Sequence, residues 1–430
     1  MDKFIIRGSS VFSGSVRISG AKNAALPIMA ACLLTDEEST LYGIPPLSDC
    51  LAMKSILEAF GAAVIWNPLK QSLIVRPAGI RPCEIPYELA TAIRASFLVM
   101  GPALARFGQA ALDMPGGCNI GLRPIDLHLK GFVALGAKVD IEHGKALASV
   151  NNLVGEKIYL DFPSVGATEN IMMAAVLADG ITIIENAATE PEIVDLANFL
   201  NTMGANVKSA GTNTIKITGV KRLYGANYTI IPDRIEAGTL MAATAARGGE
   251  IFLEDVAGDH LKPVIAKLRE MGVEVLESAE GLTVKSPGFA YLNATEIKTM
   301  PHPGFPTDLQ APFTSALALA AGNSIVTETI FENRFMHIPE LMKMGANIKI
   351  ASRSALIEGV KNLSGARVTA SDLRAGAALV IAAACAEGVS EIENIYHIDR
   401  GYYKLEEKLL GLGVKIKRIS VDTSSIEKVV

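Results

Sequence analysis

A short pattern of hydrophobic and polar positions recurs six times along the chain. Each copy is an apolar helix end followed by Gly, then Ala or Val, then any residue, then Val or Ile. Glycine just past a helix can adopt the left-handed conformation without a Cβ clash. Alternating apolar residues then predict a strand, as in residues 346–350. The glycines lie 68 to 75 residues apart, at Gly61, Gly136, Gly204, Gly272, Gly345 and Gly413.

Each copy also contains a second segment that is rich in small apolar residues and reads as a helix. Because such a helix is apolar nearly all round, we expect it to be buried. The strands that follow, such as GITIIENA and GEIFLEDV, are rich in β-branched residues. The six helices are predicted at residues 24–34, 93–104, 167–180, 235–249, 308–322 and 374–388.

Six such units predict an α/β fold with buried helices at the centre and sheets outside, divided into two domains of three units. One alternative is an ordinary α/β fold whose helix ends merely share a glycine cap, which the near-equal spacing makes weaker. Another is a stacked solenoid, although the repeat is longer than the usual 20–50 residues of such arrays.

The composition narrows the possible partners and compartment. Half of the 430 residues are hydrophobic, which is enough for a sizeable core. The net charge of -5 gives no reason to expect nucleic acid or an acidic membrane surface as a partner. The five cysteines are scattered without CxxC spacing, so neither a disulfide framework nor a zinc site is expected, and a reducing cytosol fits.

Targeting and metal signals are also missing from the sequence pattern. The N-terminus lacks the apolar core of a signal peptide, and the apolar run 375–384 is shorter than the roughly 20 residues that span a bilayer. The six histidines show no metal-ligand spacing, so no metal or other cofactor is expected. We therefore expect a cytoplasmic protein.

A glycine-rich segment, MPGGCNIGLRP at residues 114–124, contains the first candidate for chemistry. Its glycines suit a mobile lid. Arg123 would favour the thiolate of Cys118 if it lies close enough. The alternative is that Cys118 is a small buried hydrophobe. Flanking glycines favour a loop, and packing explains a loop thiol less easily.

Charged residues stand at the starts of five of the predicted buried helices. Repeat symmetry would gather these side chains at one end of the helices, and because most are cationic they suggest an anion-binding cleft. Taken singly, Lys22 reads as a solvated surface charge and Asp308 as either a helix N-cap or a general base. The five are Lys22, Arg94, Arg234, Asp308 and Arg374, and further arginines occur at Arg334 and Arg400.

Together these motifs resemble the UDP-N-acetylglucosamine 1-carboxyvinyltransferases of the EPSP synthase superfamily. The resemblance covers essentially the whole chain. It rests on SGAKNAALP (19–27), RASFLVMGPALARFG (94–108), PGGCNIGLRPIDLHLKG (115–131), FPSVGATENIM (162–172), PGFPTDLQA (303–311), ENRFMHIPEL (332–341) and YHIDRGY (396–402).

The resemblance implies a two-domain inside-out α/β barrel with three units per domain and the active site in the cleft between the domains. It implies one domain at residues 22–231, carrying the Cys118 loop, and a second made of residues 1–21 plus 232–430.

The resemblance also implies roles for individual residues. Cys118 would be the proton donor and the site of a covalent phosphoenolpyruvate adduct, and Asp308 the base at the sugar hydroxyl. Lys22, Arg123 and Arg400 would hold phosphoenolpyruvate, with Asn23 beside Lys22. Contacts to the nucleotide sugar are expected from Arg94, Arg123, Pro124, Ile125, Asp126, Leu127, Ser164, Val165, Gly166, Asp308 and Ile330, and Arg334 and Arg374 join the substrate-binding set.

The implied reaction transfers the enolpyruvyl group of phosphoenolpyruvate to the 3′-hydroxyl of UDP-N-acetylglucosamine. This is the first committed step of peptidoglycan precursor synthesis, and so serves cell-wall biogenesis, cell shape and cell division. A thiol at this place resembles the form that fosfomycin alkylates. Two alternatives stay open: a shikimate-type enolpyruvyl transferase, and a catalytically silent regulator that binds nucleotide sugars.

Overall fold

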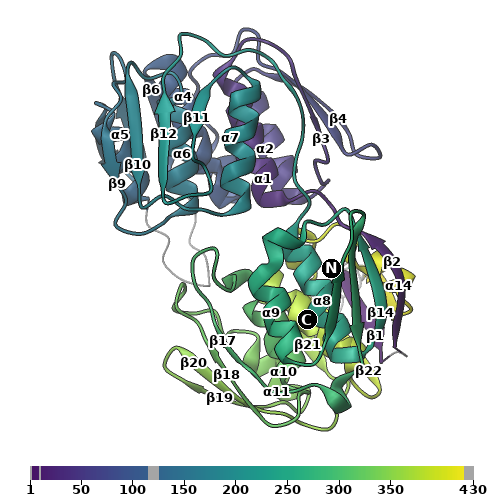
Figure 1. Cartoon of the computed structure of the whole chain (residues 1–430). Coiled ribbons are helices and arrows are strands. Elements are labelled where there is room, and N and C mark those ends of the chain that lie inside the picture. Colours follow the sequence, from purple (N-terminus) through teal and green to yellow (C-terminus); the bar gives the residue numbers. More distant parts are fainter. Residues whose placement is uncertain (1, 9–10, 115–124, 421–430) are drawn as a thin grey trace, which may run out of the picture. The chain divides into compact units, whose positions relative to one another are not determined.

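The computed structural model describes residues 2–8, 11–114 and 125–420, which form two compact units. We call the unit from Gly20 to Ile231 the Lys22 lobe. The other, the Asp308 lobe, combines the residues up to Ser19 with those from Pro232 onward. Figure 1 shows the helices and strands of each lobe.

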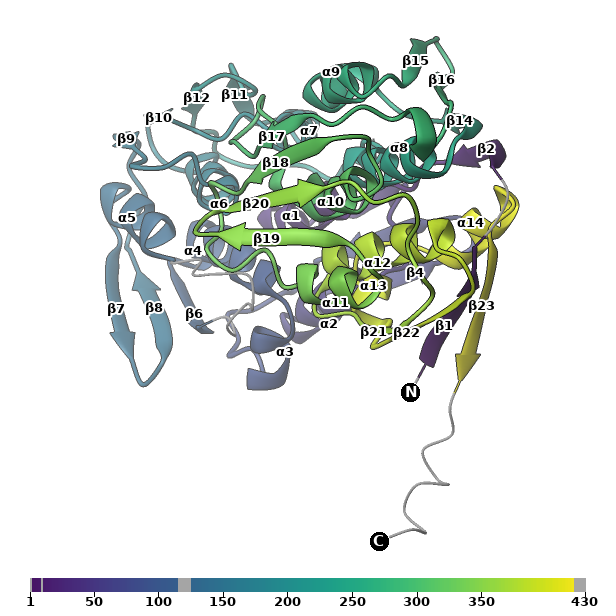
Figure 2. The ribbon, with the colours of Figure 1, turned by 90° about the horizontal axis from the view of Figure 1, so that it is seen from below.

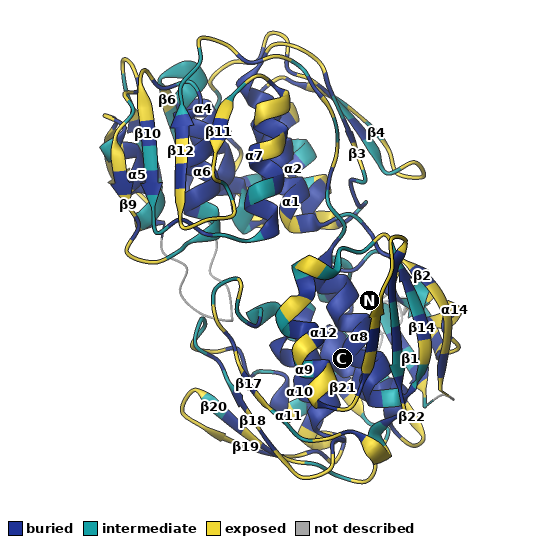
Figure 3. Cartoon of the chain, in the orientation of Figure 1, coloured by how far each residue is buried: buried dark blue, intermediate teal, exposed yellow. Residues whose placement is uncertain are grey.

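Three helices form the interior of the Asp308 lobe and contact one another: α8 (Arg234–Arg247), α10 (Gln310–Leu317) and α12 (Leu373–Cys385). Every residue of α12 from Arg374 to Cys385 is buried. Helices α8, α10 and α12 are dark blue along most of their length in Figure 3. Their apolar residues on all sides explain this burial, because a one-sided helix would leave a face in water.

Three four-stranded sheets surround these helices. The first joins β15 (Glu274–Glu277), β16 (Gly281–Ser286), β14 (Gly249–Glu254) and β2 (Phe12–Arg17). The second joins β17 (Glu296–Lys298), β18 (Asn323–Thr327), β20 (Ser354–Glu358) and β19 (Asn347–Ala351) and contacts α10 through β18 (Figure 2). The third joins β21 (Arg367–Thr369), β22 (Val389–Glu393), β1 (Asp2–Arg7) and β23 (Lys415–Ser420).

The Lys22 lobe repeats this plan. Its inner helices are α1 (Lys22–Ala31), α4 (Met100–Phe107) and α6 (Val165–Ala175). One sheet joins β13 (Asn227–Thr229), β3 (Ser39–Tyr42), β5 (Ser72–Arg76) and β4 (Ala63–Asn67). Another joins β11 (Asn206–Lys208), β12 (Thr214–Thr218), β10 (Ile181–Glu185) and β9 (Lys157–Tyr159). The third contains β6 (Gln109–Asp113), β8 (Lys145–Ser149) and β7 (Lys138–Glu142).

Six outer helices each end at one of the repeated glycines. These helices are α2 (Ser48–Ala59), α5 (Asp126–Ala134), α7 (Pro191–Thr202), α9 (Lys262–Glu270), α11 (Ile338–Lys343) and α14 (Leu405–Gly411). All six glycines have φ between 89° and 99°. The next N–H bonds back into the helix, as Val273 N–H does to Leu268 O, which is the Schellman closure. The predicted role of the glycines is confirmed.

Two strands enter sheets far from their sequence neighbours. Strand β2 pairs in parallel with β14 of the Asp308 lobe, and β13 pairs in parallel with β3 of the Lys22 lobe. The chain therefore leaves the Asp308 lobe after Ser19 and returns to it at Pro232. Within the Lys22 lobe, Ala21 N–H donates to Ile231 O at 2.8 Å; within the other, Asp233 N–H donates to Ser19 O at 2.8 Å.

The predicted fold class is confirmed, because helices lie inside and sheets outside in both lobes. Helix lengths differ from the prediction. Residues Arg94–Val99 form a 3₁₀ helix, η2, before α4 begins at Met100. Pro102 explains this in part, because a proline without an N–H is tolerated in the first turn of a helix. Helix α10 ends at Leu317, short of the predicted Gly322.

Candidate active site

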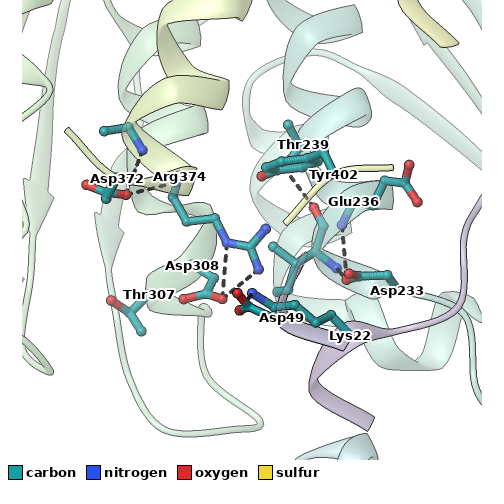
Figure 4. Close-up of polar contacts among 12 residues, drawn as sticks. Lys22, Asp49, Asp233, Glu236, Thr239, Thr307, Asp308, Asp372, Arg374 and Tyr402 are labelled. Carbon is teal, nitrogen blue, oxygen red and sulfur yellow. Dashed lines mark hydrogen bonds and ion pairs between the residues drawn. The ribbon is translucent and has the colours of Figure 1, made fainter. Parts of the chain in front are cut away.

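Asp308 lies in the short 3₁₀ helix η5 (Thr307–Leu309), directly before α10. Its Oδ1 accepts a hydrogen bond from Arg334 Nη2 at 2.6 Å, and its Oδ2 accepts from Arg374 Nη2 at 2.9 Å and Nε at 3.2 Å. The carboxylate remains one-quarter exposed, whereas both arginine side chains are almost fully buried. The structure thus brings three of the predicted site residues together, and Figure 4 shows the contact between two of them, Asp308 and Arg374.

Arg374 is the second residue of α12 and follows the N-cap Asp372, whose side chain accepts from the Arg374 and Ala375 N–H groups. Burial alone would lower the pKa of Arg374, but Tyr402, Asp308 and Asp233 together raise it above its ordinary value. The guanidinium also lies over the Tyr402 ring at 5.2 Å. Arg374 is therefore a fixed positive charge beside Asp308.

Arg334 is held in the same way by two neighbours. Its Nη1 donates to Thr307 Oγ1 at 2.8 Å while its Nη2 donates to Asp308. Its guanidinium also lies over the Phe331 ring at 5.2 Å. The two guanidinium groups thus each bond one oxygen of the Asp308 carboxylate and fix its orientation.

Arg234 and Arg400 are the two other arginines of the Asp308 lobe that the sequence pattern singled out. Arg234 opens α8 and is buried, behind the N-cap Asp233, whose carboxylate accepts from the Ile235 and Glu236 N–H groups. Burial raises the pKa of Asp233, although Arg374 opposes this. Arg400 is the C-cap of α13 (Tyr396–Asp399) and is partly exposed.

Lys22 is the first residue of α1 in the Lys22 lobe. Its ammonium bonds Asp49 Oδ2 at 2.9 Å, and both side chains are less than one-tenth exposed. The prediction of a solvated surface charge for Lys22 alone is wrong, because the first turn of α1 packs against α2 and excludes water from both groups. The neighbouring Asn23 is exposed.

A second group of predicted residues of the Lys22 lobe surrounds His128. Burial of the His128 ring is the main cause that lowers its pKa to about 3, and the positive charge of Arg94, the first residue of η2, lowers it further. The neutral ring contacts Asn170 Nδ2 through Nδ1 at 3.0 Å and Phe97 edge to face. A Cβ added at Gly166 would lie 3.2 Å from this ring, so the Ser164–Gly166 turn borders it.

Ser164 and Ile125 mark the starts of the helices next to this ring. Ser164 is the N-cap of α6 and its Oγ accepts from Ala167 N–H at 3.4 Å, while Val165 and Gly166 form the first turn. Ile125 is buried and precedes α5, with Asp126 exposed and Leu127 partly buried. Cys118, Arg123 and Pro124 lie outside the described residues.

A sequence profile of the family described as EPSP synthase (3-phosphoshikimate 1-carboxyvinyltransferase) matches residues 6–409. The "UDP-N-acetylglucosamine 1-carboxyvinyltransferase 2" of Carboxydothermus hydrogenoformans is 59% identical over 98% of this chain and 100% of its own length. The chain belongs to the EPSP synthase family, in its UDP-N-acetylglucosamine 1-carboxyvinyltransferase branch.

Other members of the branch and of the family agree with this assignment. The "UDP-N-acetylglucosamine 1-carboxyvinyltransferase 1" of Caldanaerobacter subterraneus is 58% identical over 97% of this chain and 99% of its own length. The enolpyruvyl transferase NikO from Streptomyces tendae has a similar structure, with a TM-score of 0.88, 25% identity, and 98% and 99% of the two chains covered. EPSP synthase from Acinetobacter baumannii shares the fold, with a TM-score of 0.76, 18% identity, and 98% and 100% coverage.

The structure also reveals partners that the sequence pattern did not suggest. Asp49 pairs with Lys22, and Glu328 contacts Thr307 next to Asp308. Asp49 lies in the first turn of α2 and Glu328 directly follows β18, and only the tertiary contacts identify their partners. Among the described residues, no group of three His, Cys, Asp or Glu is arranged to hold a metal ion, and no helix is long and apolar enough to cross a membrane.

Proposed function

We propose that this protein transfers the enolpyruvyl group of phosphoenolpyruvate to the 3′-hydroxyl of UDP-N-acetylglucosamine and releases phosphate. One observation carries the proposal: identity of 58–59% over nearly the full length to two proteins named for this activity. The step would take place in the cytoplasm, as the first committed step of peptidoglycan precursor synthesis.

Phosphoenolpyruvate is a small trianion at most, and the proposed residues for it are cationic. Lys22, Arg123 and Arg400 bind its phosphate and carboxylate, and Asn23 lies next to Lys22 in the chain. Lysine acts as a point charge, whereas the planar guanidinium matches the two oxygens of a carboxylate or phosphate. The ion pair with Asp49 supports this role, because it fixes the position of the Lys22 ammonium.

The nucleotide sugar contacts a larger set of residues in this proposal. Arg94, the segment 123–127 and Ile330 contact the nucleotide sugar. The Ser164–Gly166 turn meets its uridine nucleotide, and Asp308 meets the 3′-hydroxyl of its sugar. The buried His128 ring beside the Ser164–Gly166 turn supports a fixed position for that turn.

The reaction then proceeds by addition and elimination. Cys118 gives its proton to the methylene carbon of phosphoenolpyruvate, which leaves positive character at C2. The 3′-hydroxyl oxygen bonds to C2 while Asp308 takes the hydroxyl proton. The Cys118 thiolate takes a proton back from the new methyl group as phosphate departs, which restores both the double bond and the thiol. The fixed orientation of the partly exposed Asp308 carboxylate between Arg334 and Arg374 supports its role as the base.

A phosphate-release assay with different acceptors tests the proposal. Phosphate should appear when phosphoenolpyruvate and UDP-N-acetylglucosamine are both present, and fosfomycin should abolish it. Release with 3-phosphoshikimate instead would identify a shikimate-type enzyme. Calorimetric binding of UDP-N-acetylglucosamine without any release would identify a silent nucleotide-sugar-binding regulator, and either result would overturn the proposal.

A further inference from the structure

Glu328 directly follows β18, at a position where most of the other repeated units have a residue in the left-handed conformation. In four other units the equivalent residue takes the left-handed conformation: Gly43, Asn186, Asp255 and Asn394, with φ of 77°, 53°, 54° and 57°. Glu328 follows β18, does not take this conformation, and is 1% exposed. A long acidic side chain thus stands where four other units have a turn residue, and the sixth unit has Met114 after β6.

The buried carboxylate of Glu328 accepts four hydrogen bonds. Its Oε1 accepts from Thr299 Oγ1 at 2.9 Å, Ile330 N–H at 2.8 Å and Phe331 N–H at 3.2 Å. Its Oε2 accepts from Thr307 Oγ1 at 2.8 Å. A buried carboxylate is costly unless its oxygens are satisfied in this way. Glu328 thus ties two other segments, at Thr299 and Thr307, to its own turn at residues 330–331.

Two of these segments carry proposed substrate contacts. Thr307 precedes Asp308, and its Oγ1 accepts from Arg334 Nη1 at 2.8 Å while donating its own proton to Glu328. Arg334 in turn donates to Asp308 at 2.6 Å. Because a carboxylate can only accept, Glu328 fixes the direction of every hydrogen bond in this chain and leaves the Thr307 lone pairs for Arg334.

We propose that Glu328 is a positioning residue for the acceptor sugar. Through Thr307 and Arg334 it orients the Asp308 carboxylate, and through the Ile330 N–H it fixes the backbone at the proposed sugar contact. This role rests on the proposed function, but it concerns a residue that touches neither substrate. A misplacement of about 1 Å at a reacting group can cost roughly 10²-fold in rate.

Glu328→Gln provides the sharpest test, because it keeps the volume and exchanges one accepting oxygen for a donating amide. The expected result is a kcat reduced roughly 10- to 100-fold and a KM for UDP-N-acetylglucosamine raised several-fold, with the KM for phosphoenolpyruvate within about twofold. Glu340→Gln is the matched control. Its carboxylate also accepts a backbone N–H in this lobe, from Thr369 at 3.0 Å, but contacts none of the proposed substrate residues, so kcat should be unchanged.

A second variant, Thr307→Val, keeps the test decisive if Glu328→Gln is poorly folded. It removes the hydroxyl group that joins Glu328 to Arg334, while Arg334 and Arg374 still bond Asp308. It should lower kcat to a similar extent. If Glu328 acts through Thr307, the double variant is no slower than the slower single variant, because the two changes break one path. The proposal would be overturned if the loss of kcat in the double variant equalled the product of the two single losses. It would also be overturned if the kcat of Thr307→Val lay within about twofold of the wild-type value.

Calorimetry with UDP-N-acetylglucosamine separates this proposal from the proposed function. Absence of turnover by the wild-type protein would refute the enolpyruvyl transfer itself. Several-fold weaker binding by Glu328→Gln, with unaltered binding by Glu340→Gln, would still support the role of Glu328 in holding the acceptor site, and equal binding by both would count against it.

Discussion

The ammonium of Lys22 lies 2.9 Å from the carboxylate of Asp49, and water is excluded from both. Removing one partner of a buried pair leaves an uncompensated charge, which typically costs 3–5 kcal/mol. Asp49→Asn should therefore lower the free energy of unfolding by about 3 kcal/mol, measured by urea denaturation. Glu58→Gln is the control, because the exposed Lys54–Glu58 pair should contribute about 0.5 kcal/mol or less. Equal losses in the two variants would contradict a buried pair.

The proposed proton donor, Cys118, can be compared with another cysteine of the same lobe. Cys118→Ser should slow phosphate release by about 10²- to 10⁴-fold, because general acid assistance is typically worth that much. Cys83→Ser should leave the rate unchanged, since Cys83 is partly buried and its burial raises the pKa of the thiol. Mass spectrometry should place the fosfomycin adduct on Cys118. Near-normal turnover of Cys118→Ser would refute the assignment.

The outer helices end at glycine because the backbone there has a positive φ, and not because a side chain would clash with neighbouring atoms. Gly345 has φ of 94°, and a Cβ there would meet nothing within 4 Å. Gly345→Ala should therefore lower the free energy of unfolding by about 1 kcal/mol through backbone strain alone. Gly411, the last residue of α14, has equal space without a positive φ, so Gly411→Ala should be neutral or stabilise by up to about 1 kcal/mol. Thermal unfolding of both variants checks this, and the same sign for both would contradict it.

Asp195 gives the Lys22 lobe a pH-dependent stability. Burial is the main cause that raises the pKa of Asp195 to about 6, against 3.8 ordinarily, although it accepts from Tyr228 Oη at 2.6 Å and Ile231 N–H at 3.2 Å. The folded state therefore holds this proton more tightly than the unfolded state. The stability that results is complete below about pH 4 and is lost as the pH rises through about 6.

Asp195→Asn isolates this effect, because other titrating groups are common to both proteins. Between pH 4 and pH 7 the free energy of unfolding of the wild type should fall relative to the variant by up to roughly 3 kcal/mol, at 1.36 kcal/mol per pKa unit. Urea denaturation at several pH values measures the difference. If the difference in free energy of unfolding between the two proteins stays constant, or grows in favour of the wild type at higher pH, ionisation of Asp195 does not destabilise the folded state.

Much of the architecture was predictable because it depends on local rules. The spacing of Gly61 to Gly413 marks six helix ends, since only glycine takes a φ near 90° without strain, and all six follow that rule. Uniformly apolar segments predict buried helices wherever they occur. The 3₁₀ segment Arg94–Val99 was not predictable in this way, because the choice between 3₁₀ and α geometry depends on packing.

The candidate site was only partly predictable. Charged residues at helix starts indicated Lys22, Asp308 and Arg374, but the sequence could not assign their partners. Asp308 and Arg374 are 66 residues apart in sequence, yet their side chains form a hydrogen bond. The pairing of Lys22 with Asp49 likewise depends on how α1 packs on α2.

The sequence by itself determined the six-unit repeat, the inner and outer helices, and the family, because each depends on periodicity or on motifs read along the chain. Tertiary structure alone decided that Lys22 is buried, that Asp308 lies between two guanidinium groups, and that Glu328 ties Thr307 to Ile330. Burial and side-chain pairing depend on which distant segments meet, and a linear pattern does not encode that contact.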